Sequence, residues 1–245
     1  MGVLKGSTAL VTGASAGIGL ATARLLSDAG VRVIGCARRP EKLRAEMDVL
    51  SSPTLALQVD VADSESVAGL MAQLPPDWQS IDILINNAGR AVGGRRDFHE
   101  GDVAEWVNTI QINVSGLMQV TAAVLPGMLE RQSGHIVNLG SVAGLSGIRG
   151  CGAYVASKHA VHGLSDTLRQ EYAGRGIRVS EILPGMVKTD FATARFSDAE
   201  KGDAFYESYG QCLEAEDIAR SVLFALEQPP HVVVSQIVIV PDNPG

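Results

Sequence analysis

A glycine-rich stretch near the start of the chain, Thr12–Gly19 (TGASAGIG), restricts what this sequence can fold into more than any other feature. It follows an apolar run, Ala9–Val11, that is typical of a buried strand, and it precedes Leu20–Leu26, whose apolar spacing indicates a helix. A strand that turns through glycines into a helix places unpaired N–H groups and the positive end of the helix dipole at the turn. The stretch therefore predicts a site for a phosphate group.

The spacing of Gly13, Gly17 and Gly19 is G-x-x-x-G-x-G, which differs from the usual dinucleotide fingerprint G-x-G-x-x-G. Glycine is needed in such a turn because a Cβ would block it and would keep a pyrophosphate away from the backbone. By itself, this cluster is also compatible with an ordinary tight turn.

Segments typical of strands and helices alternate along the rest of the chain. Strands are expected at 31–36, 55–59, 81–85, 134–139, 177–183 and 234–240, and helices at 63–74, 103–131, 153–173, 214–226 and from about Glu41. This order predicts right-handed βαβ units. We expect an α/β fold of the Rossmann type: a doubly wound parallel sheet of about seven strands with helices on both faces.

The chain shows no linker, repeat or low-complexity segment, so we expect residues 1–245 to form a single domain. The longest segment without a regular pattern runs from Pro184 to about Leu213. Its central part, about 190–212, is expected to be an irregular lid over a substrate site. Loops that are this long in a compact domain are often functional.

Composition excludes several classes of protein. A net charge of −7 and a pI near 5.2 argue against a nucleic-acid-binding protein. No apolar run approaches the roughly 20 residues that span a membrane, and no signal peptide is recognisable. Three distant cysteines suggest a reducing compartment, and we expect a cytoplasmic protein. No metal site is expected, and a surface position or core packing is expected for each of the five histidines, His99, His135, His159, His162 and His231.

Polar residues follow several expected strands at the point where each one ends: Ser15, Asp60, Asn86 with Asn87, Ser141, and Pro184 with Gly185. Ligands of open α/β sheets bind beyond the carboxyl ends of the strands. We therefore expect these residues to meet at one rim of the sheet and to form a site.

Tyr154 and Lys158 are four residues apart on an expected helix, so they share one face. A phenol has a pKa of about 10, and a nearby ammonium favours the phenolate. Bringing this pKa near 7 needs roughly 3 units, or about 4 kcal/mol. Ser141 is expected at the same rim, where it can hydrogen-bond a substrate oxygen. The alternative for the Tyr–Lys pair alone is a solvated helix face.

Taken together, the motifs resemble those of the short-chain dehydrogenase/reductase family. In order they are Thr12–Gly19, Asp60, the run Asn86 to Gly89, Asn113, Ser141, Tyr154 with Lys158, and Pro184-Gly185 through Thr189. The resemblance covers nearly the whole chain. It implies a dinucleotide-binding and catalytic domain, and an NADP(H)-dependent enzyme that interconverts a carbonyl and an alcohol. A Ser-His-Asp hydrolase is disfavoured because Ser141 lacks the G-x-S-x-G context.

The resemblance also implies roles for four catalytic residues. Tyr154 would be the general acid/base, and Ser141 would orient the substrate oxygen. Lys158 would lower the pKa of Tyr154 and hold the nicotinamide ribose. Asn113 would open its helix to hold a water that links Lys158 to solvent.

Coenzyme contacts are implied in the same way. The adenosine and pyrophosphate side would use Gly13, Ser15, Gly17, Ile18, Gly19, Asp60, Val61, Asn87, Ala88 and Gly89. The nicotinamide side would use Tyr154, Lys158, Pro184, Gly185, Val187 and Thr189.

The end of the second expected strand predicts a preference for NADP(H). NAD-binding folds usually place an acid there, about 20 residues beyond the glycines, but this chain has Ala37 followed by Arg38 and Arg39. A guanidinium suits the 2′-phosphate of NADP. Against this, Ala16 stands where some NADP-preferring relatives carry a second basic residue. The alternative is that the two arginines begin a solvated helix.

The substrate is less constrained. The C-terminal run His231–Pro241 departs from the glycine-rich ending of 3-oxoacyl reductases and resembles the branch of serine and 3-hydroxy acid dehydrogenases and clavaldehyde-type reductases. We therefore expect a small 3-hydroxy acid, whose carboxylate could meet Arg195; the alternative for Arg195 is a solvated loop arginine. A 3-oxoacyl reductase and a non-catalytic NADP(H)-binding sensor remain alternatives. The family resemblance also implies a homotetramer or homodimer, with no nucleic-acid or membrane partner.

Overall fold

The computed structural model describes residues 4–92, 94–196 and 198–242. Seven parallel strands form one sheet in the order β3-β2-β1-β4-β5-β6-β9, which confirms the predicted fold class. The strands are β1 Thr8–Thr12, β2 Arg32–Ala37, β3 Thr54–Gln58, β4 Ile83–Asn86, β5 Gly134–Leu139, β6 Ile177–Pro184 and β9 Gln236–Ile239. The last strand is shorter than the expected 234–240.

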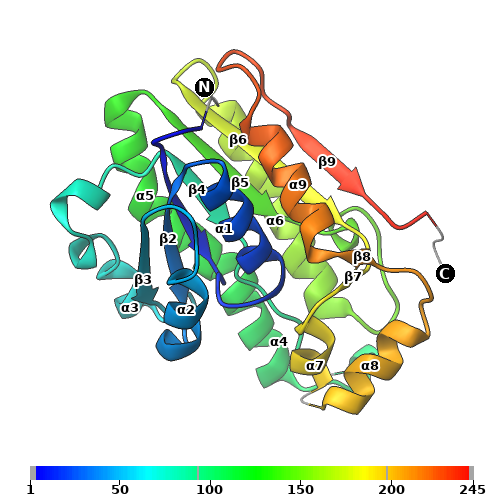
Figure 1. Ribbon diagram of the computed structural model, residues 1–245. Helices are drawn as coiled ribbons and strands as arrows, with labels where there is room; N and C mark the ends of the chain where they lie inside the picture. Colours follow the sequence, from blue (N-terminus) through cyan, green and yellow to red (C-terminus); the bar gives the residue numbers. More distant parts are fainter. Residues whose placement is uncertain (1–3, 93, 197, 243–245) are drawn as a thin grey trace.

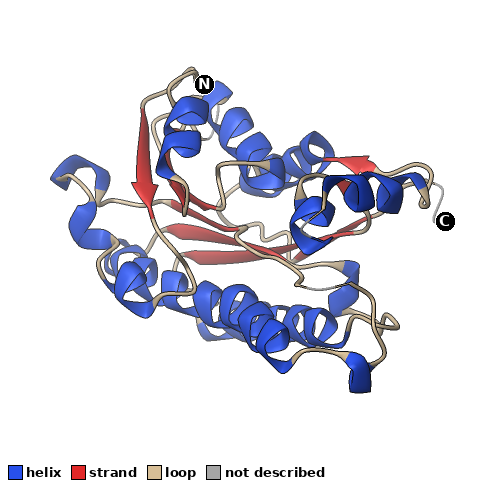
Figure 2. Cartoon of the chain, turned by 90° about the horizontal axis from the view of Figure 1, so that it is seen from below, coloured by secondary structure: helices blue, strands red, loops and turns tan. Residues whose placement is uncertain are grey.

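Helices cover both faces of this sheet, as Figure 2 shows from below. One face carries α1 (Gly17–Asp28), α2 (Pro40–Met47) and α9 (Ala215–Leu226). The other carries α3 (Ser64–Ala68), α4 (Val103–Ile110), α5 (Leu117–Arg131) and α6 (Gly152–Glu171). Short 3₁₀ turns lie at Met71–Gln73, Pro76–Trp78, Phe98–Glu100 and Val142–Gly144.

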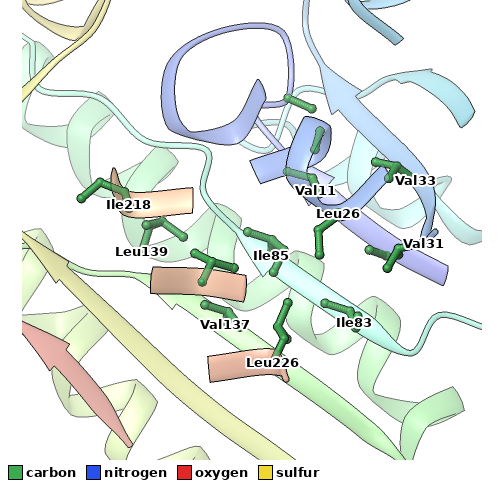
Figure 3. Close-up of a cluster of buried hydrophobic side chains, with 14 of the residues drawn as sticks. Val11, Leu26, Val31, Val33, Ile83, Ile85, Val137, Leu139, Ile218 and Leu226 are labelled. Carbon is green, nitrogen blue, oxygen red and sulfur yellow. The ribbon is translucent and has the colours of Figure 1, made fainter. Parts of the chain in front are cut away.

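The strands are apolar along their length because both of their faces are buried. On the face of α1 and α9, Leu26 and Leu226 pack over Val11, Ile85 and Val137 (Figure 3). All five are at most 1% exposed. This packing holds α1, and therefore the glycine turn that precedes it, firmly against the sheet.

The chain reverses its direction across the sheet between β1 and β4. From β1 it moves outward through β2 to β3, and then returns to build β4, β5, β6 and β9 on the other side (Figure 1). The connections after β1 and β4 therefore diverge at the carboxyl ends of these two strands, and the position between them is called the crevice below. Ligands of doubly wound sheets bind at such a position.

The expected long helix 103–131 contains a wider turn. Residues Gln111–Gly116 form a π-type turn between α4 and α5, and Asn113 lies in its middle.

The prediction that no apolar run approaches membrane-spanning length needs correction. The helix Val103–Arg131 has a mean hydropathy of 1.4 in its most apolar window and is long enough to span a bilayer by length and composition. Half of that window is buried within the fold, as in a core helix that packs on a sheet.

The segment expected to be irregular, 184–213, contains regular structure. It holds β7 (Val187–Lys188), α7 (Phe191–Phe196) and α8 (Ala199–Glu207), and β8 (Leu213–Glu214) pairs with β7. Tertiary packing supplies the order that periodicity did not indicate, because the rings of Phe196 and Phe205 lie 5.6 Å apart between the two helices. Its role as a lid stays a prediction.

Two further boundaries differ from expectation. The helix expected at 63–74 ends at Ala68, because Gly69 caps α3 and the chain continues as a 3₁₀ turn. Residues 1–3 and 243–245 of the predicted domain, and residue 197 of the predicted lid, lie outside the described residues.

Candidate active site

The glycine turn joins β1 to α1 and is fixed to the neighbouring strand. Gly13 has a φ of +69°, which favours glycine, and its N–H donates to the carbonyl oxygen of Cys36 at 2.8 Å. Ala14 N–H donates to the same oxygen at 3.2 Å. The turn is therefore anchored at the end of β2, beside Arg38 and Arg39.

Thr12 and Asn87 connect the turn to the other side of the crevice. The Thr12 hydroxyl oxygen accepts hydrogen bonds from the N–H groups of Asn87 and Ala88, each at 3.0 Å. In return, Asn87 Nδ2 donates to the carbonyl oxygen of Thr12 at 2.8 Å. These bonds hold the ends of β1 and β4 at a fixed separation.

The turn fits a dinucleotide, because the backbone itself forms its surface. A Cβ on Gly13 would lie 2.8 Å from Asn87 Nδ2, and one on Gly19 would overlap both Asn87 Nδ2 and the Gly13 carbonyl. Gly17, with φ +53°, opens the twelve-residue helix α1 and faces Thr189, 3.3 Å from where its Cβ would be. Ser15 is buried and Ile18 is half-buried in the same turn.

Arg38 and Arg39 lie directly after β2, as the sequence predicts. Both are exposed, and neither guanidinium has a hydrogen-bond or ion-pair partner among the described residues. Two such cations next to a helix N-terminus and a glycine turn suit a dinucleotide that carries an extra phosphate.

Asp60 and Val61 lie in the loop that follows β3. The Asp60 carboxylate accepts a hydrogen bond from Ala62 N–H at 3.0 Å, and Asp60 N–H donates to the Ser66 hydroxyl at 3.1 Å. Val61 is buried against Gly116, where a Cβ would lie 2.7 Å from the Val61 carbonyl oxygen. Asp60 is therefore held by the loop itself and is in place before any ligand binds.

Asn113 joins three elements of the site. Its Nδ2 donates to the Arg90 carbonyl oxygen at 2.9 Å and to the Ser157 hydroxyl at 3.0 Å, and its Oδ1 accepts from Arg90 N–H at 2.9 Å. Ser157 lies on α6 between Tyr154 and Lys158. Asn113 therefore links the loop after β4 to the catalytic helix, and Gly89 leaves room for it, since a Cβ there would be 3.3 Å from Oδ1.

The structure brings Ser141, Tyr154 and Lys158 together at the carboxyl end of β5. Lys158 is 8% exposed, and its Nζ donates to the Leu139 carbonyl oxygen at 2.7 Å. This Nζ lies 5.9 Å from the centroid of the Tyr154 ring. The Ser141 hydroxyl accepts from Ala143 N–H at 3.1 Å and faces the Pro184 carbonyl oxygen at 3.4 Å.

Burial is the largest influence on the pKa values of Tyr154 and Lys158. Burial raises the pKa of Tyr154 above its ordinary value, and the Ser141 hydroxyl and the Arg195 charge oppose this rise. The Lys158 ammonium donates to Leu139 and lies beside the Tyr154 ring, so its effect on the pKa of Tyr154 stays a prediction. Burial lowers the pKa of Lys158 itself to about 8, and the Glu181 charge works against that shift.

The nicotinamide-side residues lead from β6 into α7. Gly185 N–H donates to the Ile239 carbonyl oxygen at 2.7 Å, and Val187 is buried in β7. Thr189 is held by Tyr206 of α8, whose hydroxyl donates to the Thr189 carbonyl at 3.0 Å. The start of the segment 184–213 therefore lies beside the glycine turn, where Thr189 faces Gly17.

A pocket opens in front of Tyr154, with about 720 Å³ of empty space that is partly open to solvent. Its walls include Arg96, Trp106, Cys151 and Arg195. Arg195 is 9% exposed, and its Nη2 lies 3.4 Å from Cys151 Sγ. The substrate-side prediction for Arg195 therefore agrees with its position, although the role itself stays a prediction.

Sequence reasoning missed the other walls of this pocket. Trp106 stacks on Phe98 with ring centroids 4.3 Å apart, and both lie far from the recognised motifs. The sequence signal for this pair was the presence of two aromatic residues near the start of the long helix, but their spacing does not distinguish a pocket wall from an ordinary helix and loop.

Among the residues with described placement, no group of three or more His, Cys, Asp or Glu side chains could hold a metal.

One histidine prediction needs correction. His162 Nδ1 lies 2.8 Å from Oε2 of Glu181, a residue of β6 that is fully buried. His162 therefore pairs with a buried carboxylate and does not simply fill space. The available signal was Glu181 itself, a charged residue in the middle of the apolar strand 177–183.

Known proteins that are similar to this chain agree with this geometry. A family model described as short chain dehydrogenase matches residues 7–200. The NADP-dependent 3-hydroxy acid dehydrogenase YdfG of Salmonella typhi is 41% identical over 234 residues, 95% of this chain and 94% of that protein. An NADP-dependent 3-hydroxy acid dehydrogenase of Schizosaccharomyces pombe is 37% identical over 251 residues, 100% of this chain and 96% of that protein. A solved structure described as the closed form of serine dehydrogenase complexed with NADP+ has a TM-score of 0.91 at 38% identity, covering 95% of this chain and 94% of that one.

The glycine turn gives the first testable prediction. Gly13→Ala should reduce affinity for NADPH at least about tenfold, because the Cβ pushes Asn87 out of place, and it should also destabilise the fold by about 1–2 kcal/mol through the left-handed backbone. Gly174→Ala is the matched control, since its φ is +74° but nothing lies within 4 Å of its Cβ. Fluorescence titration with NADPH and denaturant unfolding separate the two effects. Equal affinity in both variants would contradict the close approach at Gly13.

Proposed function

Because the chain belongs to the short-chain dehydrogenase family, we propose that it is an NADP(H)-dependent oxidoreductase that interconverts the alcohol of a small 3-hydroxy acid and the corresponding carbonyl. One observation carries this proposal: Ser141, Tyr154 and Lys158 meet at the rim where the glycine turn leaves its backbone bare. The names of the relatives support both the coenzyme and the substrate class.

The coenzyme would lie along the crevice between β1 and β4. Gly13, Ser15, Gly17, Ile18 and Gly19 would hold its pyrophosphate at the N-terminus of α1. Adenosine would contact Asp60 and Val61 on one side and the Asn87–Gly89 stretch on the other. The 2′-phosphate would meet Arg38 and Arg39, which are free to turn toward it. Pro184, Gly185, Val187 and Thr189 would line the nicotinamide, and Lys158 its ribose.

When bound, the nicotinamide supplies or accepts the hydride. Tyr154 handles the proton: it protonates the carbonyl oxygen during reduction, and it takes the proton of the alcohol during oxidation. Since burial raises its pKa, Tyr154 rests as the phenol, which is the form that reduction requires. Ser141 would hydrogen-bond the same substrate oxygen and orient it.

Lys158, with a pKa of about 8, is mostly an ammonium at pH 7. In that form it favours the phenolate that oxidation needs. Asn113 would support a water between Lys158 and solvent. Its side-chain amide is already occupied by Arg90 and Ser157, so this water would bind the main-chain carbonyls of the widened helical turn.

Arg195 would bind the substrate carboxylate. It lines the same pocket as Tyr154 and acts on the phenol through its charge, so a carboxylate at Arg195 would place the neighbouring carbons of a small acid near Tyr154. A guanidinium pairs with a carboxylate through two parallel hydrogen bonds.

We also propose a homotetramer, or at least a homodimer, in the cytoplasm. Two separate surfaces expose apolar side chains: Val103, Val107 and Met118 on α4 and α5, and Phe224, Val238 and Val240 on α9, β9 and the residue after it. Two such surfaces suit two different two-fold axes. The free thiols of Cys36, Cys151 and Cys212 suit a reducing compartment.

The acid/base role predicts that Tyr154→Phe lowers kcat by about 10²–10⁴-fold with NADPH affinity unchanged, because only the hydroxyl is lost. Tyr172→Phe, at the C-terminal end of the same helix α6, is the control and should be fully active. Steady-state kinetics and NADPH titration give the result. Turnover of the Tyr154 variant within threefold of wild type would remove Tyr154 from the mechanism.

Coenzyme choice is the third prediction. Arg38→Ala should reduce the ratio of kcat/KM for NADP(H) over NAD(H) by about 10–100-fold, since a charge-assisted hydrogen bond to phosphate contributes roughly 1.5–3 kcal/mol. Arg44→Ala, an exposed arginine on α2, should leave the ratio unchanged. A wild type that prefers NAD(H) would overturn the assignment.

Substrate recognition is the fourth prediction. Arg195→Ala should raise KM for 3-hydroxy acids at least about tenfold and leave KM for neutral alcohols nearly unchanged, because only the acids lose a charged partner. Arg149→Ala removes a surface arginine and serves as control, since that side chain is 89% exposed. An equal effect on acidic and neutral substrates would show that Arg195 has no part in carboxylate binding.

Assembly is the fifth prediction. Light scattering at micromolar concentration should give two or four times the mass of the 25.7 kDa chain. Replacing Val107 by Glu should weaken the complex if α4 and α5 form one interface, whereas Val49→Glu, at an exposed position outside both surfaces, should not. A monomeric wild type would contradict the proposal.

A further inference from the structure

A buried carboxylate lies between β6 and the catalytic helix α6. Glu181 is 0% exposed, in the middle of β6, and its side chain faces α6. Its Oε2 pairs with His162 Nδ1 at 2.8 Å, and its Oε1 has no hydrogen-bond partner in the described structure. An ionisable group with an unpaired oxygen at such a site destabilises the fold, so packing alone does not explain it.

The position of this carboxylate relates it to Lys158. Oε1 packs directly against Gly140, leaving no space for a Cβ there. The residue before Gly140 is Leu139, whose carbonyl oxygen accepts the hydrogen bond from Lys158 Nζ. His162 lies one helical turn after Lys158 on α6. The Glu181 carboxylate and the Lys158 ammonium thus approach the same short backbone segment, without forming a direct ion pair within the described residues.

We propose that Glu181, held in place by His162, is a positioning residue that keeps Lys158 protonated and thereby sets the alkaline limit of proton transfer by Tyr154. This inference rests on the proposed dehydrogenase reaction, and it assigns a task to a residue outside the coenzyme and substrate contacts proposed above.

The charges around the site support this coupling. Burial lowers the pKa of Lys158 to about 8, and Glu181 is the group that opposes the shift. Burial raises the pKa of Glu181, and three groups on α6 oppose this rise: His162, Lys158 and Arg169. Lys158 Nζ lies 5.9 Å from the centroid of the Tyr154 ring, so the charge on Lys158 is the route by which Glu181 reaches the phenol.

The neighbouring strand shows what a purely structural residue would look like. Asn138 is the register partner of Glu181 on β5 and faces the same helices. It is neutral, its Oδ1 accepts from Asn86 and its Nδ2 donates to Ser165, each at 2.9 Å. A neutral amide of that kind would be enough to cross-link β6 to α6. A buried carboxyl group whose Oε1 has no hydrogen-bond partner in the described structure points to an electrostatic task.

The test is the pH profile of kcat/KM for oxidation of a 3-hydroxy acid. In Glu181→Gln, which keeps size and hydrogen bonding to His162, the alkaline limb should move to lower pH by about half a unit to one unit, because a lost negative charge favours neutral Lys158. At one pH on that limb, kcat/KM then falls about three- to tenfold. The acid limb should stay in place.

Three further variants complete the design. Glu181→Met removes the charge with similar length and no polar group, so it should reproduce the shift if the glutamine variant fails to fold. Glu181→Asp restores the carboxylate and should return the limb toward its wild-type position. Ser180→Ala is the control: it removes the partner of His135, a polar pair buried on the other face of the same strand.

A second readout does not depend on turnover. NMR titration of lysine labelled at Cε, with the Lys158 signal assigned by Lys158→Arg, should show Lys158 losing its proton at lower pH in the two neutral variants. A lower profile with both limbs unmoved, or an unchanged Lys158 titration, would overturn the inference. If the wild type oxidises no 3-hydroxy acid, the proposed function fails, while the titration still decides the role of Glu181.

Discussion

The interaction on which the rest of the structure depends is the exchange of hydrogen bonds between Thr12 and Asn87. It joins β1 and β4, the two strands after which the chain turns in opposite directions across the sheet. The bonds involve side chains and lie just beyond the last backbone pairing of these two strands. Gly13 and Gly19 are bare because Asn87 occupies the space of their side chains. The crevice therefore exists before any coenzyme enters, and the dinucleotide would meet a preorganised backbone surface.

Much of this arrangement was predictable from the sequence. Alternating apolar strands and helices specified the sheet, and the ends of parallel strands specified which polar residues would meet. Tyr154 and Lys158 share a helix face because of their spacing alone. In contrast, Thr12 was not singled out as the residue that joins the two strands, since that role depends on its contact with a loop some 75 residues away.

What the sequence did not predict depends on tertiary contacts. The helices α7 and α8 carry little periodicity of their own, and they are stabilised by Phe196 and Phe205 packing together. The direction of the Lys158 ammonium toward Leu139 follows from the depth of its burial, which a helix pattern cannot report. The pairing of His162 with Glu181 is of the same kind, because the two residues meet only when α6 lies on β6.

The contacts of Tyr206 restrict how the segment over the pocket can move. Its hydroxyl bonds the backbone of Thr189 and lies 3.3 Å from Ala192 N, so α8 carries the start of α7 with it. One phenol hydroxyl therefore ties the residue that follows β7 and the start of α7 to the same point of α8. Loss of this hydroxyl would release both backbone segments at once, and with them the helix that carries Arg195 into the pocket wall.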